Sequence, residues 1–302
     1  MRVKSREGHA ENGSIALLAL WGVVLICILI APVAFATRGD VQIAHNAFAE
    51  SRARLAAEAG TQIGLQRLLR RFGAGTTAFD GTPEAWTLES TQVAIAIADE
   101  AGKVDLNLAP ADLLVGLFEA VGEPRAAAEL IACNVLSERG DHGADCPQAD
   151  VAHVGRRFAV TEELAAVPGV SGVLYDRVAP YVTVATGASA IDPRVAPRAV
   201  LLAIPGATAG LVDAFLDSRK TWSDLGVDDA ETFASAAPYV MISPHRDFTI
   251  AATAATSDGA RYRAELQVRL TGRAAQPYQV IAWRTPPADR GAAAPVKTAR
   301  VP

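Results

Sequence analysis

The chain has 302 residues, of which 50% are hydrophobic, and it carries a formal net charge of −5. This length allows about two domains, and the acidic balance argues against a nucleic-acid-binding protein, because phosphate contacts require a basic surface. The five histidines are scattered without the spacing of zinc ligands. The sequence therefore predicts neither an enzyme nor a resident cofactor.

A polar, basic leader and a long apolar segment open the chain. The leader covers residues 1–13, and residues 15–36 are apolar and almost uncharged. At about 1.5 Å per residue, a helix of this length reaches roughly 33 Å, enough to cross a hydrocarbon core of about 30 Å. The sequence predicts a transmembrane helix over residues 14–36, with the basic leader in the cytoplasm.

Three interpretations of this N-terminus stay open. A secretory signal peptide would be cleaved after Ala36, although the apolar run exceeds the roughly 7–15 residues of a signal core. A plain signal anchor needs no special residue before the span. A prepilin-type leader would end at Gly13, at the junction of the polar and apolar segments, with Ser14 as the new N-terminus. The position of Gly13 favours this third interpretation.

The segment that follows, residues 41–72, is Ala-rich and contains no proline. We expect it to continue the same helix into water as a stem. Its apolar stripe is dominated by small residues and does not keep heptads, which is typical of close packing against a sheet and neighbouring helices.

The pattern changes from helical to alternating between residues 87 and 108. Val93, Ile95 and Ile97 share one face, and a turn follows at residues 99–102, so the sequence predicts a β-hairpin whose second arm is residues 103–108. The Ala109-Pro110 dipeptide then opens a helix predicted over residues 111–121.

The segment around Asp105 recurs around Asp192 with identical spacing. The matched positions are Val104 with Ile191, Asp105 with Asp192, Ala109-Pro110 with Ala196-Pro197, and Leu113-Leu114 with Val200-Leu201. The second copy has Arg194 where the first has Asn107, so we expect any capping by that side chain to be lost there.

Two Pro-Gly turns are predicted within helical hairpins. They are Val167-Pro168-Gly169-Val170 and Ile204-Pro205-Gly206-Ala207. Three strands then close the domain, over residues 247–256, 261–270 and 278–284, with a turn at residues 257–260. Residues 286–302 have almost no large apolar side chain and are predicted to form a flexible tail.

The Gly13 junction, the segment around Asp105, the hairpin region and the closing strands together resemble the pilin-like proteins. Most members of that superfamily have Glu at the fifth mature position, whereas Leu18 occupies it here. In this respect the chain resembles the minor pseudopilin K family (GspK) of type II secretion systems, in which that position is apolar.

The resemblance implies an α+β fold: a pilin-like long N-terminal helix packed on an antiparallel sheet, with a large inserted α-helical domain of helix-hairpin-helix or SAM-like type. On this basis residues 37–110 form the stem and first strands, residues 111–240 the insertion, and residues 241–285 the last strands. Such a protein catalyses nothing.

The resemblance also implies a role at the tip of the type II secretion pseudopilus, initiating and capping the fibre for protein export. Its partners would be the I-type and J-type minor pseudopilins, the prepilin peptidase, which also methylates the new N-terminus, and the inner-membrane secretion platform. The chain would be a single-pass inner-membrane protein with its C-terminal domain in the periplasm. The alternative is a membrane-anchored helix-hairpin-helix receptor for DNA uptake.

Two further features concern the soluble region. Cys133 and Cys146 would lie outside the cytoplasm, where a disulfide between them would stabilise the fold by about 3 kcal/mol. No metal site is expected, although a metal ion stays open at one polar segment and structural calcium at one acidic segment. The candidates for the metal ion are Asp141, His142, Asp145, Cys146 and Asp150, and those for calcium are Asp224, Asp228, Asp229 and Glu231.

Overall fold

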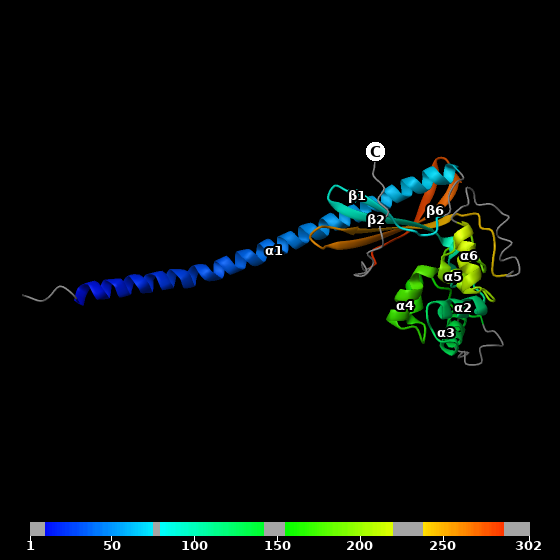
Figure 1. Ribbon diagram of the computed structural model, residues 1–302, viewed down its shortest axis with the longest axis horizontal. Helices are drawn as coiled ribbons and strands as arrows, with labels where there is room; N and C mark the ends of the chain where they lie inside the picture. The colour runs from blue at the N-terminus through cyan, green and yellow to red at the C-terminus, as the bar shows by residue number, and fades with distance from the viewer. Residues whose placement is uncertain (1–9, 75–78, 142–154, 220–237, 287–302) are drawn as a thin grey trace, which may run out of the picture.

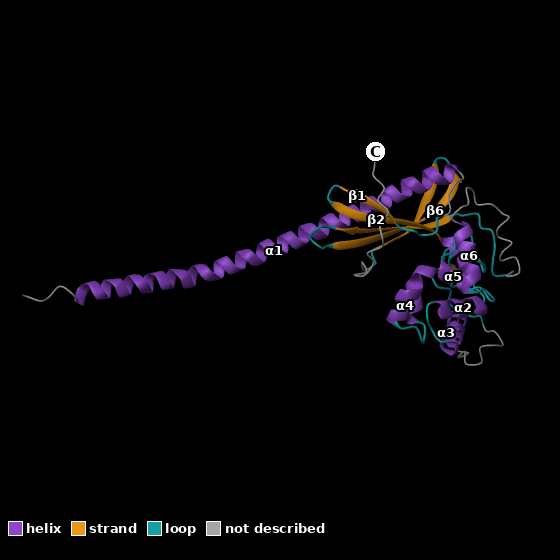
Figure 2. Ribbon diagram, in the orientation of Figure 1, coloured by secondary structure: helices purple, strands orange, loops and turns teal. Residues whose placement is uncertain are grey.

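The computed structural model describes residues 10–74, 79–141, 155–219 and 238–286. Within them, a long helix runs along one face of an antiparallel sheet and projects far beyond it, and a separate group of helices lies at the other end of the sheet (Figures 1 and 2). The predicted α+β class, with a pilin-like helix packed on a sheet and an added helical domain, is confirmed.

Helix α1 (Ala10–Ala74) is continuous over 65 residues, so the predicted single stem is confirmed. Small residues allow its second half to approach the sheet closely: Ala53 and Ala57 are fully buried. At Gly60 a methyl group would lie only 2.8 Å from Cγ1 of Val93 and 2.9 Å from Cβ of Ala252. Because ordinary carbon contacts lie at about 3.5–4.0 Å, this position requires glycine.

The sheet has five antiparallel strands in the order β1-β2-β5-β6-β7. They are β1 (Glu84–Leu88), β2 (Thr91–Asp99), β5 (Asp247–Ala255), β6 (Arg261–Arg273) and β7 (Gln276–Arg284). The predicted alternation in β2 is confirmed, since Val93, Ile95 and Ile97 are buried in the core between the sheet and α1. The three predicted closing strands are also present.

The predicted hairpin over residues 87–108 is wrong. Strand β2 pairs with β1 before it and β5 after it, and the chain then leaves the sheet through a short 3-10 helix, η1 (Glu100–Gly102). The next strand, β3 (Val104–Asp105), pairs in parallel with β4 (Val182–Thr183) in the helical domain. Alternation identifies a strand but not its partner, which is decided here by tertiary pairing.

The helical domain lies between β2 and β5 in the sequence. Its helices are α2 (Ala111–Ala120), α3 (Arg125–Glu138), η2 (Thr161–Ala166), α4 (Gly172–Val178), η3 (Ala179–Tyr181), α5 (Arg198–Leu202) and α6 (Ala209–Arg219). Leu113, Leu117 and Phe118 are among the residues of its core, which is a separate cluster from the core beneath α1. The domain and the sheet are thus two separately packed units.

The repeat around Asp105 and Asp192 has the same backbone geometry in both copies. The Asp105 carboxylate accepts the N–H of Asn107 at 2.9 Å, and the Asp192 carboxylate accepts that of Arg194 at 3.0 Å. Each repeat also begins at a parallel bridge, Val104 to Val182 in the first and Ile191 to Val240 in the second. The repeat in the sequence therefore folds into a repeat in the structure.

An arginine near the end of a helix completes each copy. Arg139 follows α3 and donates to two carbonyl oxygens of the turn before α2. Arg219, the last residue of α6, does the same at the turn before α5. The acceptors are Leu106 (3.0 Å) and Ala109 (2.8 Å) for Arg139, and Pro193 (3.2 Å) and Ala196 (2.7 Å) for Arg219. Burial lowers the pKa of both guanidinium groups.

The two predicted Pro-Gly turns are present. Gly169 and Gly206 have positive φ of 91° and 83°, a conformation that glycine adopts without a Cβ penalty. The helices that follow begin alike, because Ser171 and Thr208 each accept a backbone N–H three residues later, at 3.1 and 3.3 Å.

The side chain of Asn107 makes a tertiary contact. Its amide forms two hydrogen bonds with the backbone of Phe158, at 3.0 and 2.7 Å, and so connects the turn that begins at Asp105 to a segment 51 residues away. The residue at the matched position, Arg194, instead forms an ion pair with Asp192.

Candidate assembly stem and interdomain clasp

The stem carries the residues that the sequence places at a processing site. Gly13 and Ser14 both fall within α1, but their surroundings lie outside the described residues. Leu18 is described, and 72% of its surface is exposed. Processing at Gly13 stays a prediction.

The apolar part of α1 is uncovered in the isolated chain. Trp21, Ile26 and Leu29 each expose more than half of their surface, as do most of the large apolar residues between Leu17 and Ile30. Over the residues that the structure describes, no helix combines the length and the apolar character that crossing a membrane requires.

A second exposed apolar feature lies farther along the stem. Val41, Phe48 and Leu55 recur every seven residues, and each exposes at least 65% of its surface. At 100° per residue, successive members are displaced by about 20°, so the three form one stripe. The stripe, named here the stem stripe, lies about 180° around the helix from the sheet-facing Ala53 and Ala57.

A cluster of buried ionisable groups connects the sheet to the helical domain. His245, just before β5, lies between Asp99 at the end of β2 and Arg194 in the turn before α5. Its Nδ1 is 2.6 Å from Oδ2 of Asp99, and its Nε2 is 2.8 Å from a terminal nitrogen of Arg194. Arg194 in turn forms an ion pair at 2.6 Å with Asp192, which is fully buried. We call these four residues the interdomain clasp.

The clasp is held firmly in place. His245 has a positive φ of 48°, an uncommon conformation for a residue with a Cβ. The Asp99 carboxylate also accepts the N–H of Ala101 at 2.9 Å, and Asp192 accepts that of Ser243 at 2.9 Å. Burial is the main influence on the pKa of Asp99 and raises it, although its hydrogen bond with His245 acts in the opposite direction.

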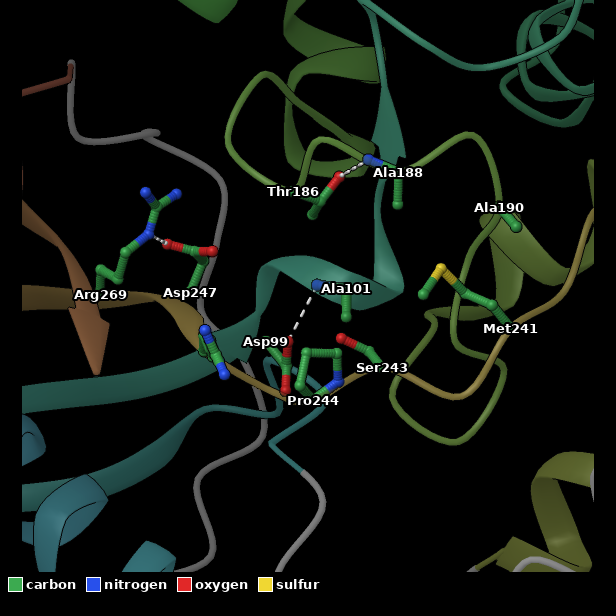
Figure 3. Close-up of a pocket in the computed structure, with 11 residues that line it drawn as sticks. Asp99, Ala101, Thr186, Ala188, Ala190, Met241, Ser243, Pro244, Asp247 and Arg269 are labelled. Carbon is green, nitrogen blue, oxygen red and sulfur yellow. Dashed lines mark hydrogen bonds and ion pairs between the residues drawn. The ribbon is translucent and has the colours of Figure 1, made fainter. Parts of the chain in front are cut away.

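A cavity of about 350 Å³ lies beside the clasp (Figure 3). Its lining includes Asp99, Ser243 and Met241, and the pair formed by Asp247 and Arg269 across 2.7 Å. Burial raises the pKa of Asp247, and this effect outweighs the hydrogen bond from Arg269, which lowers the pKa. These charged groups are already paired with one another, so the cavity does not by itself indicate a ligand.

Further polar contacts join the two units. Three are made by arginine side chains, namely Arg219 to Asp80 (3.3 Å), Arg284 to Glu162 (3.2 Å), and Arg269 to the carbonyl oxygen of Ala185 (3.1 Å). In addition, the backbone N–H of Asp192 donates to the carbonyl oxygen of Ala101 (2.8 Å).

The chain has the fold of a known secretion component. A chain in the crystal structure of the GspK-GspI-GspJ complex from the enterotoxigenic Escherichia coli type 2 secretion system is similar to it, with a TM-score of 0.52 and 16% sequence identity. The match covers 83% of this chain and 99% of that chain. This chain has a GspK-like pilin fold. No protein-family model matches the sequence, and no curated protein does.

Within this GspK-like fold, the cysteine prediction is only partly visible. Cys133 on α3 is disulfide-bonded, whereas Cys146 lies outside the described residues, so their pairing stays a prediction. Cys27 is free and exposed.

The metal-ion and calcium candidates also lie mostly beyond the described segments. Of them, only Asp141 is described, and it lies 2.8 Å from Nε of Arg139. His142, Asp145 and Asp150 fall outside, as do Asp224, Asp228, Asp229 and Glu231. Among the described residues there is no group of three or more His, Cys, Asp or Glu that could hold a metal ion.

The helical hairpins bear on the DNA-receptor alternative. Arg177, after the first hairpin, pairs with Glu123, and Arg198, before the second, pairs with Asp213 at 2.7 Å. Because the carboxylates neutralise these guanidinium groups, neither is available to a phosphate without first losing its partner.

Sequence reasoning found the repeat but missed its completing arginines and the clasp. Arg139 and Arg219 lie 34 and 27 residues after the aspartates whose turns they bind, so no fixed spacing marks them. His245 looked like an ordinary loop histidine, because its partners are more than 50 residues away in the sequence.

Proposed function

We propose that this chain is a non-catalytic minor pseudopilin of the GspK type, located at the tip of a type II secretion pseudopilus. The observation that carries the proposal is the GspK-like fold matched over 99% of a chain from the GspK-GspI-GspJ complex. The apolar, exposed stem supports it, because such a surface needs a partner that excludes water.

The stem would serve two environments in turn. Before assembly, residues 14–36 would lie in the inner membrane as a single span, with the C-terminal domain in the periplasm. During assembly, the secretion platform would move the helix into a bundle of pseudopilin stems. Its apolar surface then stays out of water throughout, so the transfer does not expose it.

Leu18 favours a terminal place in that bundle. In the pilin-like proteins that this chain resembles, a glutamate at the fifth mature position neutralises the N-terminal amine of a neighbouring subunit. A buried ammonium without that partner costs several kcal/mol. A subunit with Leu18 offers no such carboxylate to a subunit stacked on it, which suits the end of a fibre.

The helical domain supports a capping role. It lies at the end of the sheet remote from the projecting stem (Figure 1), where a further subunit would otherwise stack. We propose that its bulk blocks that position, so the chain initiates the fibre and ends it.

The stem stripe would contact the stems of the I-type and J-type partners. Full burial of a side chain such as Phe48 or Leu55 stabilises a complex by about 1.5–3 kcal/mol relative to exposure. We expect Phe48→Glu to weaken co-purification with the two partners strongly. Ile43→Glu is the matched control, because Ile43 is equally exposed but lies on a different face of α1. Equal recovery of both partners with Phe48→Glu and wild type would exclude the stripe as the contact.

Maturation provides the first test of the proposal. We propose that a prepilin peptidase cleaves after Gly13 and methylates the amine of Ser14. Intact mass and N-terminal sequencing of the membrane-extracted protein, with and without co-expressed peptidase, would then give a start at Ser14 only with the enzyme. Gly13→Ala should abolish this cleavage, and Leu18→Glu should leave it intact while disturbing secretion.

Other N-terminal residues would indicate other functions. A start at Thr37 would indicate a soluble exported protein and would contradict the proposal. An uncleaved chain in the presence of active peptidase would favour an anchored receptor. The paired Pro-Gly hairpins with their Ser171 and Thr208 caps are the feature that keeps a DNA receptor as the second candidate, and fluorescence anisotropy with duplex DNA would test it.

A further inference from the structure

The relative position of the two units depends on polar contacts. Among the residues that the structure describes, the core of the helical domain and the core beneath α1 are separate clusters, so no shared apolar core fixes one unit on the other there. Two chain segments cross between them, residues 99–104 and residues 240–247. At the crossing, the backbone of Gly102 lies so close to Val195 that a Cβ there would be 2.6 Å from the Val195 oxygen. The clasp sits at this same place.

Hydrogen-bond chemistry specifies the protonation state of the clasp. A guanidinium group donates and cannot accept, so the 2.8 Å contact requires Nε2 of His245 to accept from Arg194. The proton of the neutral ring is then on Nδ1, where it is donated to Asp99 across 2.6 Å. The clasp as it stands therefore holds a neutral imidazole.

Protonation of the ring would remove the acceptor that Arg194 uses. An N–H on Nε2 would point at the Arg194 guanidinium, which also carries hydrogens. Oδ2 of Asp192 lies 3.6 Å from Nε2, and it already accepts from Arg194 and Ser243. The charged and titratable groups that face the ring are thus Asp99 from β2, and Asp192 and Arg194 from the turn before α5. His245 exposes only 15% of its side chain, so water does not readily replace the lost contact.

We propose that the interdomain clasp is a proton-sensitive latch: with His245 neutral it fixes the helical domain on the sheet, and protonation of His245 releases that fixed orientation. The other described polar contacts between the units are made by arginines, which stay charged throughout, and by the backbone, which does not titrate. Imidazole is the side chain whose charge ordinarily changes between about pH 5 and 8.

The test measures the distance between the two units in the full chain in detergent. Cys27→Ser removes the exposed free thiol. Asp258→Cys, in the exposed turn between β5 and β6, and Val173→Cys, on exposed α4, then carry nitroxide labels for pulsed dipolar spectroscopy. We expect one narrow distance distribution at about pH 8 and a second, broader population at about pH 5, reversible on return to about pH 8.

Variants separate His245 from other titrating groups. His245→Gln keeps an acceptor for Arg194 and a donor for Asp99 but cannot gain a proton, so its distribution should be the same at both pH values. His245→Asn, which tolerates positive φ better, serves if the Gln variant does not fold. His45→Gln, on the exposed stem, should retain the wild-type response.

Two results would overturn the proposal. One is a wild-type distribution that does not change between the two pH values while circular dichroism shows the chain folded. The other is a change in His245→Gln or His245→Asn equal to that of wild type. The latch does not depend on the proposed role in secretion, since it is measured on the isolated chain.

Discussion

Gly60→Ala tests how closely the stem approaches the sheet. A methyl group at this position would lie 2.8 Å from Val93 and 2.9 Å from Ala252, about 0.6–1.2 Å inside ordinary contact distance. Both neighbours are at most 1% exposed, so neither side chain has free space into which to move. The helix must therefore move away from the sheet.

Two opposing contributions decide the magnitude. In an exposed helix, replacing Gly by Ala stabilises by roughly 0.5–1 kcal/mol. Overpacking a close-packed core costs about 1–3 kcal/mol. We expect a net loss of about 1–2 kcal/mol in the free energy of unfolding, equal to roughly a tenfold increase in the opening equilibrium.

Hydrogen exchange measured by mass spectrometry on the full chain provides the assay. Exchange of the buried part of α1 and of β5 should be about ten times faster in Gly60→Ala, under conditions where exchange reports the opening equilibrium. Gly210→Ala, in α6, is the matched control: no atom lies within 4 Å of the added methyl, so it should exchange no faster than wild type.

A double variant strengthens the test. Val93→Ala removes one of the two clashing groups, so Gly60→Ala should be less harmful in that background than in wild type. Wild-type exchange in Gly60→Ala, or equal losses in both backgrounds, would refute the close packing from which the magnitude is derived.

Three further results are expected. Asp105→Ala should lower the free energy of unfolding by about 2–4 kcal/mol in urea titrations, because it leaves the donors of Asn107, Thr186 and Gly187 without their acceptor. Phe248→Ala should cost about 3–5 kcal/mol in the same assay, because it removes a ring that is 99% buried in the core beneath α1. The hydrogen bond from Arg198 lowers the pKa of Asp213. The stability that this pair contributes is therefore present above the pKa of the unfolded state and is lost as pH falls through the pKa of the folded state. In Arg198→Gln, the titration midpoint of the Asp213 carboxyl, measured by NMR, should rise.

Much of the secondary structure could be predicted because it depends on local patterns. The Ala-rich, proline-free segment after the apolar run predicted the stem, and α1 confirms it over 65 residues. Alternation located β2 and the three closing strands. The Pro-Gly turns were predicted because glycine is the residue that adopts positive φ without penalty, as Gly169 and Gly206 do.

Local sequence patterns could not predict which segments pair or contact one another. The alternating residues up to Asp99 do not indicate which strand pairs with them, and the predicted hairpin with residues 103–108 was wrong. The side chain of Asn107 binds the backbone of Phe158, 51 residues away, a contact that no local pattern indicates.

The sequence by itself therefore determined the elements, the apolar stem and the repeated turns around Asp105 and Asp192, because each depends on residues near one another in the chain. Only the tertiary structure decided that Arg139 and Arg219 complete those turns, and that Asp99, Asp192, Arg194 and His245 meet at the junction of the two units. Such contacts depend on the geometry with which separate elements pack. A single histidine or arginine has the same local sequence signal whether it lies in water or in a buried clasp.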